Sequence, residues 1–322
     1  MSQNRNLEIH SKIDTPDGTG LFARLIRMPS AKNHIPIILN DGLGCNGFIW
    51  KHFIEYFKAQ HPIIHWHYRG HGHSDTPEQI QNIGMEHAGR DLELILDHFG
   101  YDEAILCGHS MGVQVALEAY RNRPDRYPRL ILMCGSYEYP LLHWHNSPIR
   151  HRRPTWLNQM ISAGFPRIFP LIQKYHFVWQ SLWSLLLSTD LPYQIAMYFE
   201  VNRKRIEKED FLPYFKHLSS MPIEVFVQML KSYSEHSARA VLEQIDKPTL
   251  IISGGQDTFC PHWILEDLHR TVENSELLYI PDGTHCAPIE HPELIHLRTE
   301  KFLRPLHSRR SDSTIDAYTA IR

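Results

Sequence analysis

A serine between two glycines is the residue best suited to chemistry in this sequence. Gly108-His-Ser-Met-Gly112 has the pattern G-x-S-x-G, with a strand-like run before it and a helix-like pattern from Val113 after it. The glycines allow a sharp turn that lifts the Ser110 hydroxyl out of the sheet at the start of the helix. There the helix dipole and the Met111 N–H favour a developing oxyanion. The pattern therefore predicts a nucleophilic serine rather than a structural serine in a tight turn.

A serine nucleophile needs a base, and the base needs a carboxylate to orient it. Two later strand-like runs end in Gly255-Gln-Asp257 and in Pro281-Asp-Gly-Thr-His285. Parallel strands end at the same edge of a sheet, so we expect Ser110, Asp257 and His285 to meet there. Taken singly, Asp257 could cap a helix and His285 could be a surface histidine.

The loop after the run Ile35–Asn40 reads Asp41-Gly-Leu-Gly44. Its glycines allow the Leu43 N–H to point at the space above Ser110, opposite the Met111 N–H. We therefore predict an oxyanion hole formed by the backbone N–H groups of Leu43 and Met111. Gly42 and His109, which flank these groups in the chain, are the predicted substrate-binding positions.

The elements that position these residues follow from the hydrophobic pattern. Short β-branched runs alternate with longer stretches at helical spacing, which predicts an α/β fold with a mostly parallel sheet of about eight strands, flanked by helices. The expected strands are Leu7–Ile13 (an edge), Gly20–Met28, Ile35–Asn40, Pro62–Tyr68, Glu103–Gly108, Leu130–Gly135, Thr249–Gly254 and Glu276–Ile280. The expected helices are Phe48–Ala59, Met85–Phe99, Met111–Arg121, Trp263–Val272 and Glu290–Leu303.

One long segment lacks strand-like runs. Residues 137–237 are rich in Trp, Tyr, Phe, Leu and His in helical blocks, which predicts a helical cap inserted into a core of residues 1–136 and 238–306. Residues 307–322 are polar and are expected to form a flexible tail. Five apolar positions in the cap follow helical spacing: Leu171, Tyr175, Val178, Leu182 and Leu185. We expect this stripe to pack the cap onto the sheet, with a peripheral membrane-surface patch as the alternative.

Composition excludes several classes of protein. The 322 residues carry 33 Lys+Arg and 36 Asp+Glu, a balance that argues against nucleic-acid binding. The five cysteines are scattered and odd in number, which argues against a disulfide framework and favours a reducing compartment. The first residues show no secretory signal, and no apolar run approaches the ~20 residues of a transmembrane segment. We therefore expect a cytoplasmic protein.

Histidine is abundant, with 23 residues, and His65, His67, His71 and His73 are grouped. No Cys or Glu lies near this group in the chain, so satisfied polar and turn histidines are the better interpretation. We expect no metal site and no organic cofactor. Arg69, in the same stretch, is expected to bond backbone carbonyl groups and shape the loop beside the site.

Together these motifs resemble the α/β-hydrolase fold superfamily, in its cap-bearing kind that includes esterases, lipases, carbon–carbon bond hydrolases and haloperoxidase-like enzymes. The matching segments are Asp41-Gly-Leu-Gly44, Tyr68-Arg-Gly-His-Gly-His-Ser-Asp75, Gly108-His-Ser-Met-Gly112, Gly255-Gln-Asp257 and Gly283-Thr-His285. The resemblance covers about residues 7–306, apart from the cap. Many relatives begin the oxyanion loop with His-Gly, where this chain has Asn40-Asp41-Gly42. Serine at position 110, where an aspartate would stand in haloalkane dehalogenases and epoxide hydrolases, separates the chain from those enzymes.

The expected function is that of a serine hydrolase, similar to carboxylesterases and lipases, which cleaves a lipophilic or uncharged ester through an acyl-enzyme. Two alternatives use the same three residues, namely cleavage of a carbon–carbon bond in a β-diketone-like substrate and transfer of the acyl group to another acceptor. A third is a ligand-binding protein that keeps the fold without turnover. The expected partner is a small, apolar ester, and the sequence leaves the oligomeric state open.

Overall fold

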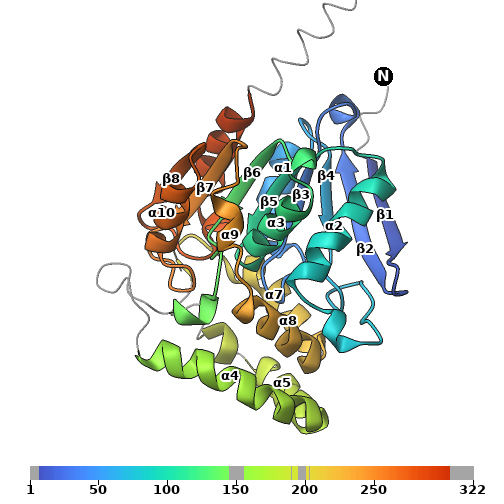
Figure 1. The fold of residues 1–322 in the computed structure, drawn as a ribbon, viewed down its shortest axis with the longest axis vertical. Coiled ribbons are helices and arrows are strands. Elements are labelled where there is room, and N and C mark those ends of the chain that lie inside the picture. The colour runs from blue at the N-terminus through green and yellow to red at the C-terminus, as the bar shows by residue number, and fades with distance from the viewer. Residues whose placement is uncertain (1–6, 145–155, 190, 195–200, 203, 305–322) are drawn as a thin grey trace, which may run out of the picture.

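The computed structural model describes residues 7–144, 156–189, 191–194, 201–202 and 204–304, so the expected C-terminal tail and the first six residues lie outside the described part. One sheet forms the centre (Figure 1). Its strands are β1 (Leu7–Asp14), β2 (Gly20–Arg27), β3 (Ile37–Asn40), β4 (Ile63–Trp66), β5 (Ile105–His109), β6 (Arg129–Met133), β7 (Thr249–Gly254) and β8 (Ser275–Ile280). They lie in the order β1-β2-β4-β3-β5-β6-β7-β8. β2 runs opposite to the other seven strands, which are parallel to one another, and this confirms the predicted eight-stranded, mostly parallel sheet.

Helices cover both faces of the sheet. They are α1 (Lys51–Phe57), α2 (Met85–Phe99), α3 (Met111–Asn122), α4 (Trp156–Lys174), α5 (His176–Leu187), α7 (Lys208–Ser220), α8 (Ile223–Glu235), α9 (Arg239–Leu242), α10 (His262–Thr271), α11 (Ala287–Glu290) and a helical stretch at 292–304. Successive residues of the central strands point to opposite faces. Ile105 and Cys107 therefore join the core beneath α1, whereas Leu106 joins the core beneath α2 and α3 (Figure 1).

The predicted helix Glu290–Leu303 is two helices in the structure. His291 ends α11 with φ −131° and ψ 50°, and the helical stretch 292–304 begins at Pro292. Proline disfavours a helical conformation in the residue before it, but it fits the first turn of a new helix. The predicted strand Pro62–Tyr68 is also shorter, since β4 spans Ile63–Trp66.

The segment between β6 and β7 is helical in its described parts, and a single bridge between Glu138 and Ser237 pairs its two ends. The expectation that Leu171, Tyr175, Val178, Leu182 and Leu185 pack this segment onto the sheet is wrong. Each of these side chains is at least 50% exposed.

The inward contacts of α4 and α5 come from other positions. Phe169 packs with Ile223 and Val227 of α8, and the Trp183 indole donates to the Leu218 carbonyl at 3.0 Å. The chain also breaks between the two helices at Tyr175, so a single helical period does not run through both. No helix in the described ranges has the length and apolarity that a bilayer crossing requires.

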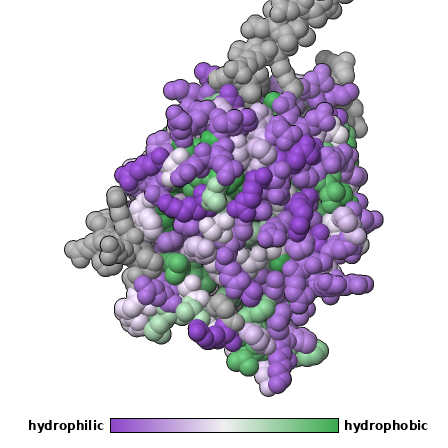
Figure 2. Space-filling model, viewed as in Figure 1, coloured by the Kyte–Doolittle hydropathy of each residue, from purple (hydrophilic) through white to green (hydrophobic). Residues whose placement is uncertain are grey.

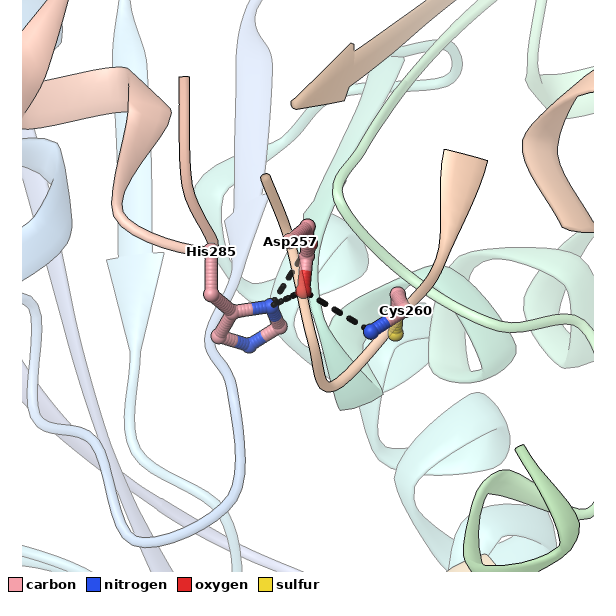
Figure 3. Close-up of side chains that lie close together, drawn as sticks. All are labelled: Asp257, Cys260 and His285. Carbon is pink, nitrogen blue, oxygen red and sulfur yellow. Dashed lines mark hydrogen bonds and ion pairs between the residues drawn. The ribbon is translucent and has the colours of Figure 1, made fainter. Parts of the chain in front are cut away.

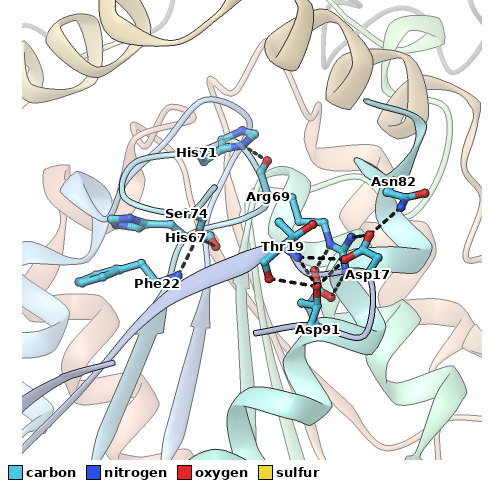
Figure 4. A network of polar contacts seen from close by, with 10 residues as sticks. Asp17, Thr19, Phe22, His67, Arg69, His71, Ser74, Asn82 and Asp91 are labelled. Carbon is cyan, nitrogen blue, oxygen red and sulfur yellow. Dashed lines mark hydrogen bonds and ion pairs between the residues drawn. The ribbon is translucent and has the colours of Figure 1, made fainter. Parts of the chain in front are cut away.

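Arg69 bonds carboxylates rather than the expected backbone carbonyls (Figure 4). Its Nε and Nη2 donate to both oxygens of Asp91 at 2.7 and 2.8 Å, and its Nη1 donates to Asp17 at 2.6 Å. The network joins the loop after β4 to α2 and to the β1–β2 turn. Asp91 lies in α2 and is 2% exposed, so its charge depends on this guanidinium.

Replacing Arg69 with Met should lower the free energy of unfolding by about 3–5 kcal/mol, because a buried carboxylate loses its partner. Chemical denaturation followed by circular dichroism measures the change. Arg69→Met combined with Asp91→Asn should recover part of the loss, since no buried charge then remains. The matched control is Arg123→Met, which breaks an exposed bidentate pair with Asp125 and should change stability little. Similar stability of Arg69→Met and Arg123→Met would contradict this account.

Candidate active site

Ser110 lies on a strained turn between β5 and α3. Its backbone has φ 57° and ψ −122°, a conformation that residues other than glycine rarely adopt. The chain packs so closely around the turn that only glycine fits on either side. A Cβ at Gly108 would lie 2.3 Å from the Gly112 carbonyl oxygen, and a Cβ at Gly112 would lie 2.1 Å from the Asn40 carbonyl oxygen. The G-x-S-x-G pattern therefore has a steric reason in this fold.

The structure brings Ser110, His285 and Asp257 into contact, each from the carboxyl end of a different strand. Ser110 Oγ is 2.9 Å from His285 Nε2, and His285 Nδ1 is 2.9 and 3.1 Å from the two Asp257 oxygens. With Nδ1–H donating to the carboxylate, Nε2 keeps its lone pair for the serine hydroxyl. This arrangement can move a proton from the serine to the imidazole.

Asp257 is completely buried and held by its own loop. Oδ1 accepts the backbone N–H groups of Phe259 and Cys260 at 2.9 and 2.8 Å. The carboxylate does not cap α10, because that helix has no side-chain cap. Its hydrogen bonds thus fix the carboxylate beneath the imidazole.

The loop that carries His285 is fixed from two sides. Glu290 accepts the Thr284 N–H and hydroxyl at 2.8 and 2.6 Å. On the other side, His109 Nε2 lies 2.8 Å from the His285 carbonyl oxygen. Burial, together with the neighbouring His285, lowers the pKa of His109 to about 3, so His109 is neutral near pH 7 and donates through Nε2–H. The described contacts of His109 are with protein groups, and its contact with a substrate stays a prediction.

The loop of residues 41–44 lies over Ser110. A Cβ at Gly42 would be 3.1 Å from the Ser110 Cβ, so this loop approaches the serine closely. The N–H groups of Leu43 and Met111 donate no hydrogen bond to another residue in the described part of the chain. Both groups are free for a ligand oxygen, and their role as oxyanion donors stays a prediction.

A buried polar chain holds this loop at Asp41. Trp50 Nε1 donates to Oδ1 at 2.7 Å, and His65 Nε2 is 3.0 Å from Oδ2. Arg24 Nε donates to the other ring nitrogen of His65 at 3.3 Å, which leaves the Nε2 proton for Asp41. The Tyr68 hydroxyl donates to the Asp41 carbonyl at 2.8 Å. Asp41 thus has hydrogen-bond partners for both carboxylate oxygens and for its backbone carbonyl.

Sequence reasoning missed these partners of Asp41. The interpretation of His65 as a satisfied polar histidine agrees with its full burial and its two ring contacts, but it named neither partner. The only signal in the sequence was the position of His65 in a strand, which implies that its side chain points to one face of the sheet. That signal does not identify the carboxylate it meets.

Helices α7 and α8 also reach the site. The Tyr233 hydroxyl of α8 faces the side chains of Ser110 and Cys260, and burial raises its pKa well above the ordinary value. A Cβ at Gly44 would lie 2.5 Å from Leu218 and 3.4 Å from Phe226, so both side chains cover the oxyanion loop. Sequence reasoning did not single out any of these three side chains.

One aromatic side chain stands beside the imidazole, and a second packs against the first. The ring of Phe259 lies 4.9 Å from the His285 ring and stacks on Trp144 at 6.1 Å between centroids. The surroundings of Ser110 therefore combine a few hydrogen-bonding groups with apolar walls, as binding sites for small molecules usually do.

Asp257, Cys260 and His285 form a group whose donor atoms lie within 4.8 Å of one another (Figure 3). Metal binding requires a thiolate, but burial, with Asp257 nearby, raises the pKa of the Cys260 thiol well above its usual value. The Asp257 carboxylate already accepts bonds from the imidazole and two backbone N–H groups. Hydrogen bonding explains the proximity of these three residues better than metal binding does.

Known proteins share this architecture. Residues 35–292 match the family model of the alpha/beta hydrolase fold. A 3-oxoadipate enol-lactonase of Acinetobacter baylyi is 23% identical, over 89% of this chain and 94% of its own length. The uncharacterized hydrolase YugF of Bacillus subtilis is 22% identical, over 90% and 96%. A thermophilic esterase structure from Thermogutta terrifontis has a TM-score of 0.71 at 20% identity, covering 94% of this chain and 99% of that one. The chain belongs to the α/β-hydrolase fold family, as its motifs had indicated.

Proposed function

We propose that this protein is a serine hydrolase that cleaves a lipophilic or uncharged carboxylic ester. The observation that carries the proposal is the unbroken contact from Ser110 Oγ through His285 to the buried Asp257. Similarity to an esterase and to an enol-lactonase supports an ester bond as the target. We assign the nucleophile to Ser110, the general base to His285 and the orienting carboxylate to Asp257.

In the proposed reaction, Ser110 Oγ attacks the ester carbonyl while His285 takes its proton. The N–H groups of Leu43 and Met111 hold the tetrahedral oxyanion, each contributing about 3 kcal/mol to the barrier reduction. His285 then protonates the departing alcohol, which leaves an acyl group on Ser110. Water, deprotonated by the same imidazole, attacks the acyl-enzyme and releases the carboxylic acid.

Helices of the segment 137–237 support an apolar substrate. Leu218 and Phe226 cover the oxyanion loop, and Phe259 of the core stands beside His285. These apolar side chains can pack against an ester but cannot form hydrogen bonds with it. We assign the segment the role of a cap over the core of residues 1–136 and 238–306.

The oxyanion loop depends in this proposal on Asp41 as a positioning residue. Its carboxylate accepts from Trp50 and His65 at the same time, and both donors are fully or almost fully buried. An Asn side chain has only one acceptor oxygen, so it would face one of these donors with its own N–H₂. The mismatch should displace the Leu43 N–H from the oxyanion.

Ser110→Ala should abolish labelling by a fluorophosphonate probe and lower kcat/KM for p-nitrophenyl butyrate about 10⁴-fold or more. The matched control is Ser253→Ala. Ser253 Oγ also lies near a histidine ring nitrogen, His262 Nδ1 at 3.0 Å, but Ser253 is on β7 and not on the turn after β5. The control should label like the wild type. Labelling of folded Ser110→Ala would refute the assignment of the nucleophile, and an unlabelled, folded wild type would favour a ligand-binding protein.

Asp41→Asn should lower kcat about 10- to 100-fold with little change in KM, since an oxyanion donor is displaced while ground-state contacts remain. Adding Trp50→Phe removes one of the two donors and should restore part of the rate. Asp75→Asn, at an exposed pair with Lys12, is the matched control and should behave like the wild type. Steady-state kinetics on a p-nitrophenyl ester, with circular dichroism to verify folding, measures all three. Full activity of Asp41→Asn would exclude the positioning role.

The wild type should hydrolyse p-nitrophenyl esters and leave a vinylogous β-diketone intact. Product analysis by liquid chromatography with a hydroxylamine trap follows both reactions and any acyl transfer. Cleavage of the diketone at a rate equal to or above that of the ester would replace the ester proposal by carbon–carbon hydrolysis. Hydroxamate as the main product at low hydroxylamine would indicate an acyltransferase.

A further inference from the structure

The surface of α4 and α5 is unusually apolar. Thirteen of the twenty-one large hydrophobic side chains that are exposed in the described residues lie between Trp156 and Leu191. Trp156, Phe177 and Leu185 are 71%, 78% and 66% exposed. A soluble monomer rarely exposes large apolar side chains together in this way unless the patch binds something.

The exposed apolar side chains of α4 lie on one side of that helix, since Trp156, Met160, Ile168 and Leu171 recur at spacings of three, four and eight residues. Those of α5 cover most of its circumference, because Phe177, Val178, Trp179, Leu182, Leu185 and Leu186 are all exposed. The inward contacts come from Phe169 and Trp183, which contact α8 and Leu218. We name the outward side of the two helices the α4–α5 face.

The α4–α5 face lies at one end of the molecule, away from the sheet (Figure 1). Figure 2 shows green hydrophobic side chains at this end, mixed with polar ones. A projecting end is accessible to a flat, extended surface without obstruction from the core.

Charge distinguishes this part of the chain from the rest. Residues 139–189 contain no Asp or Glu, although the whole chain carries more acidic than basic residues. The same stretch contains Arg150, Arg152, Arg153, Arg167 and Lys174. Arg167 and Lys174 lie on α4 itself, among the exposed apolar side chains. A cationic, acid-free and aromatic-rich helix surface has the composition that binds anionic lipid interfaces.

We propose that the α4–α5 face docks the protein on an anionic lipid membrane. Trp156, Phe177 and Leu185 enter the boundary between headgroups and acyl chains, while Arg167 and Lys174 keep their charges at the lipid phosphates. A second copy of the chain fits this face less well. A twofold interface would place the same cationic side chains of both copies against each other, without acidic partners from this stretch.

Sedimentation with lipid vesicles tests the proposal on the full chain. Phosphatidylcholine vesicles with about 30 mol% phosphatidylglycerol should bind the protein, and pure phosphatidylcholine vesicles should bind it at least about tenfold more weakly. Binding to the anionic vesicles should weaken as NaCl is raised. The assay needs no turnover, so its outcome is independent of the proposed function.

Phe177→Ser with Leu185→Ser should lower the partition coefficient about tenfold or more, because two large apolar side chains are removed from the interface. The charge variant Arg167→Gln with Lys174→Gln should lower binding to anionic vesicles about fivefold per charge and leave binding to neutral vesicles unchanged. Leu294→Ser with Leu297→Ser is the matched control. These leucines are 44% and 62% exposed but lie in the stretch 292–304, so the control should bind like the wild type.

Three results would overturn the proposal. The first is a folded wild type that sediments with neither kind of vesicle. The second is equal loss of binding in the control pair and in Phe177→Ser with Leu185→Ser. The third is a dimer in sedimentation velocity that Phe177→Ser with Leu185→Ser converts to a monomer, since a second copy would then cover the face. Melting temperatures of all variants, which change only exposed positions, verify the fold.

Discussion

The contact between Ser110 Oγ and His285 Nε2 is the interaction on which the rest of the site depends. It joins residues that are 175 positions apart in the chain, at a distance of 2.9 Å. A hydrogen bond tolerates only a few tenths of an ångström, so every element beneath it has to be rigid. The parallel strands β5, β7 and β8 supply that rigidity, because their carboxyl ends meet at one edge of a sheet that is packed on both faces.

Buried carboxylates hold the loops of the site, which the sheet does not position by itself. Asp41, Asp257 and Glu290 are all buried, and each accepts at least two hydrogen bonds from groups in or beneath the site loops. A buried carboxylate is stable only with such partners, so each one selects a single loop conformation. The loop of residues 41–44 shows this well, since Trp50 and His65 bond the two oxygens of Asp41 from different elements.

The helices between β6 and β7 have two different surfaces. Toward the core, α7 and α8 place Leu218, Phe226 and Tyr233 over the serine and its oxyanion loop. Away from the core, α4 and α5 expose apolar and cationic side chains. Because the inner surface contacts the proposed ester site and the outer side chains are exposed in the described residues, substrate selection and the proposed membrane docking can change independently. A lipophilic ester dissolves in a lipid membrane. The proposed ester site and the proposed docking face would therefore both act at the same membrane.

The sequence by itself determined the eight strands, the turn at Ser110 and the three residues that meet at the sheet edge. These follow from local signals, namely hydrophobic period, glycine spacing and the order of strand ends, which act over a few residues. Only the tertiary structure decided that Arg69 bonds Asp91 and Asp17, that His65 bonds Asp41, and that Leu171 and Leu185 face outward. A helical period predicts which side chains share a face of the helix. Whether that face packs against the protein or is exposed to solvent depends on contacts between distant segments.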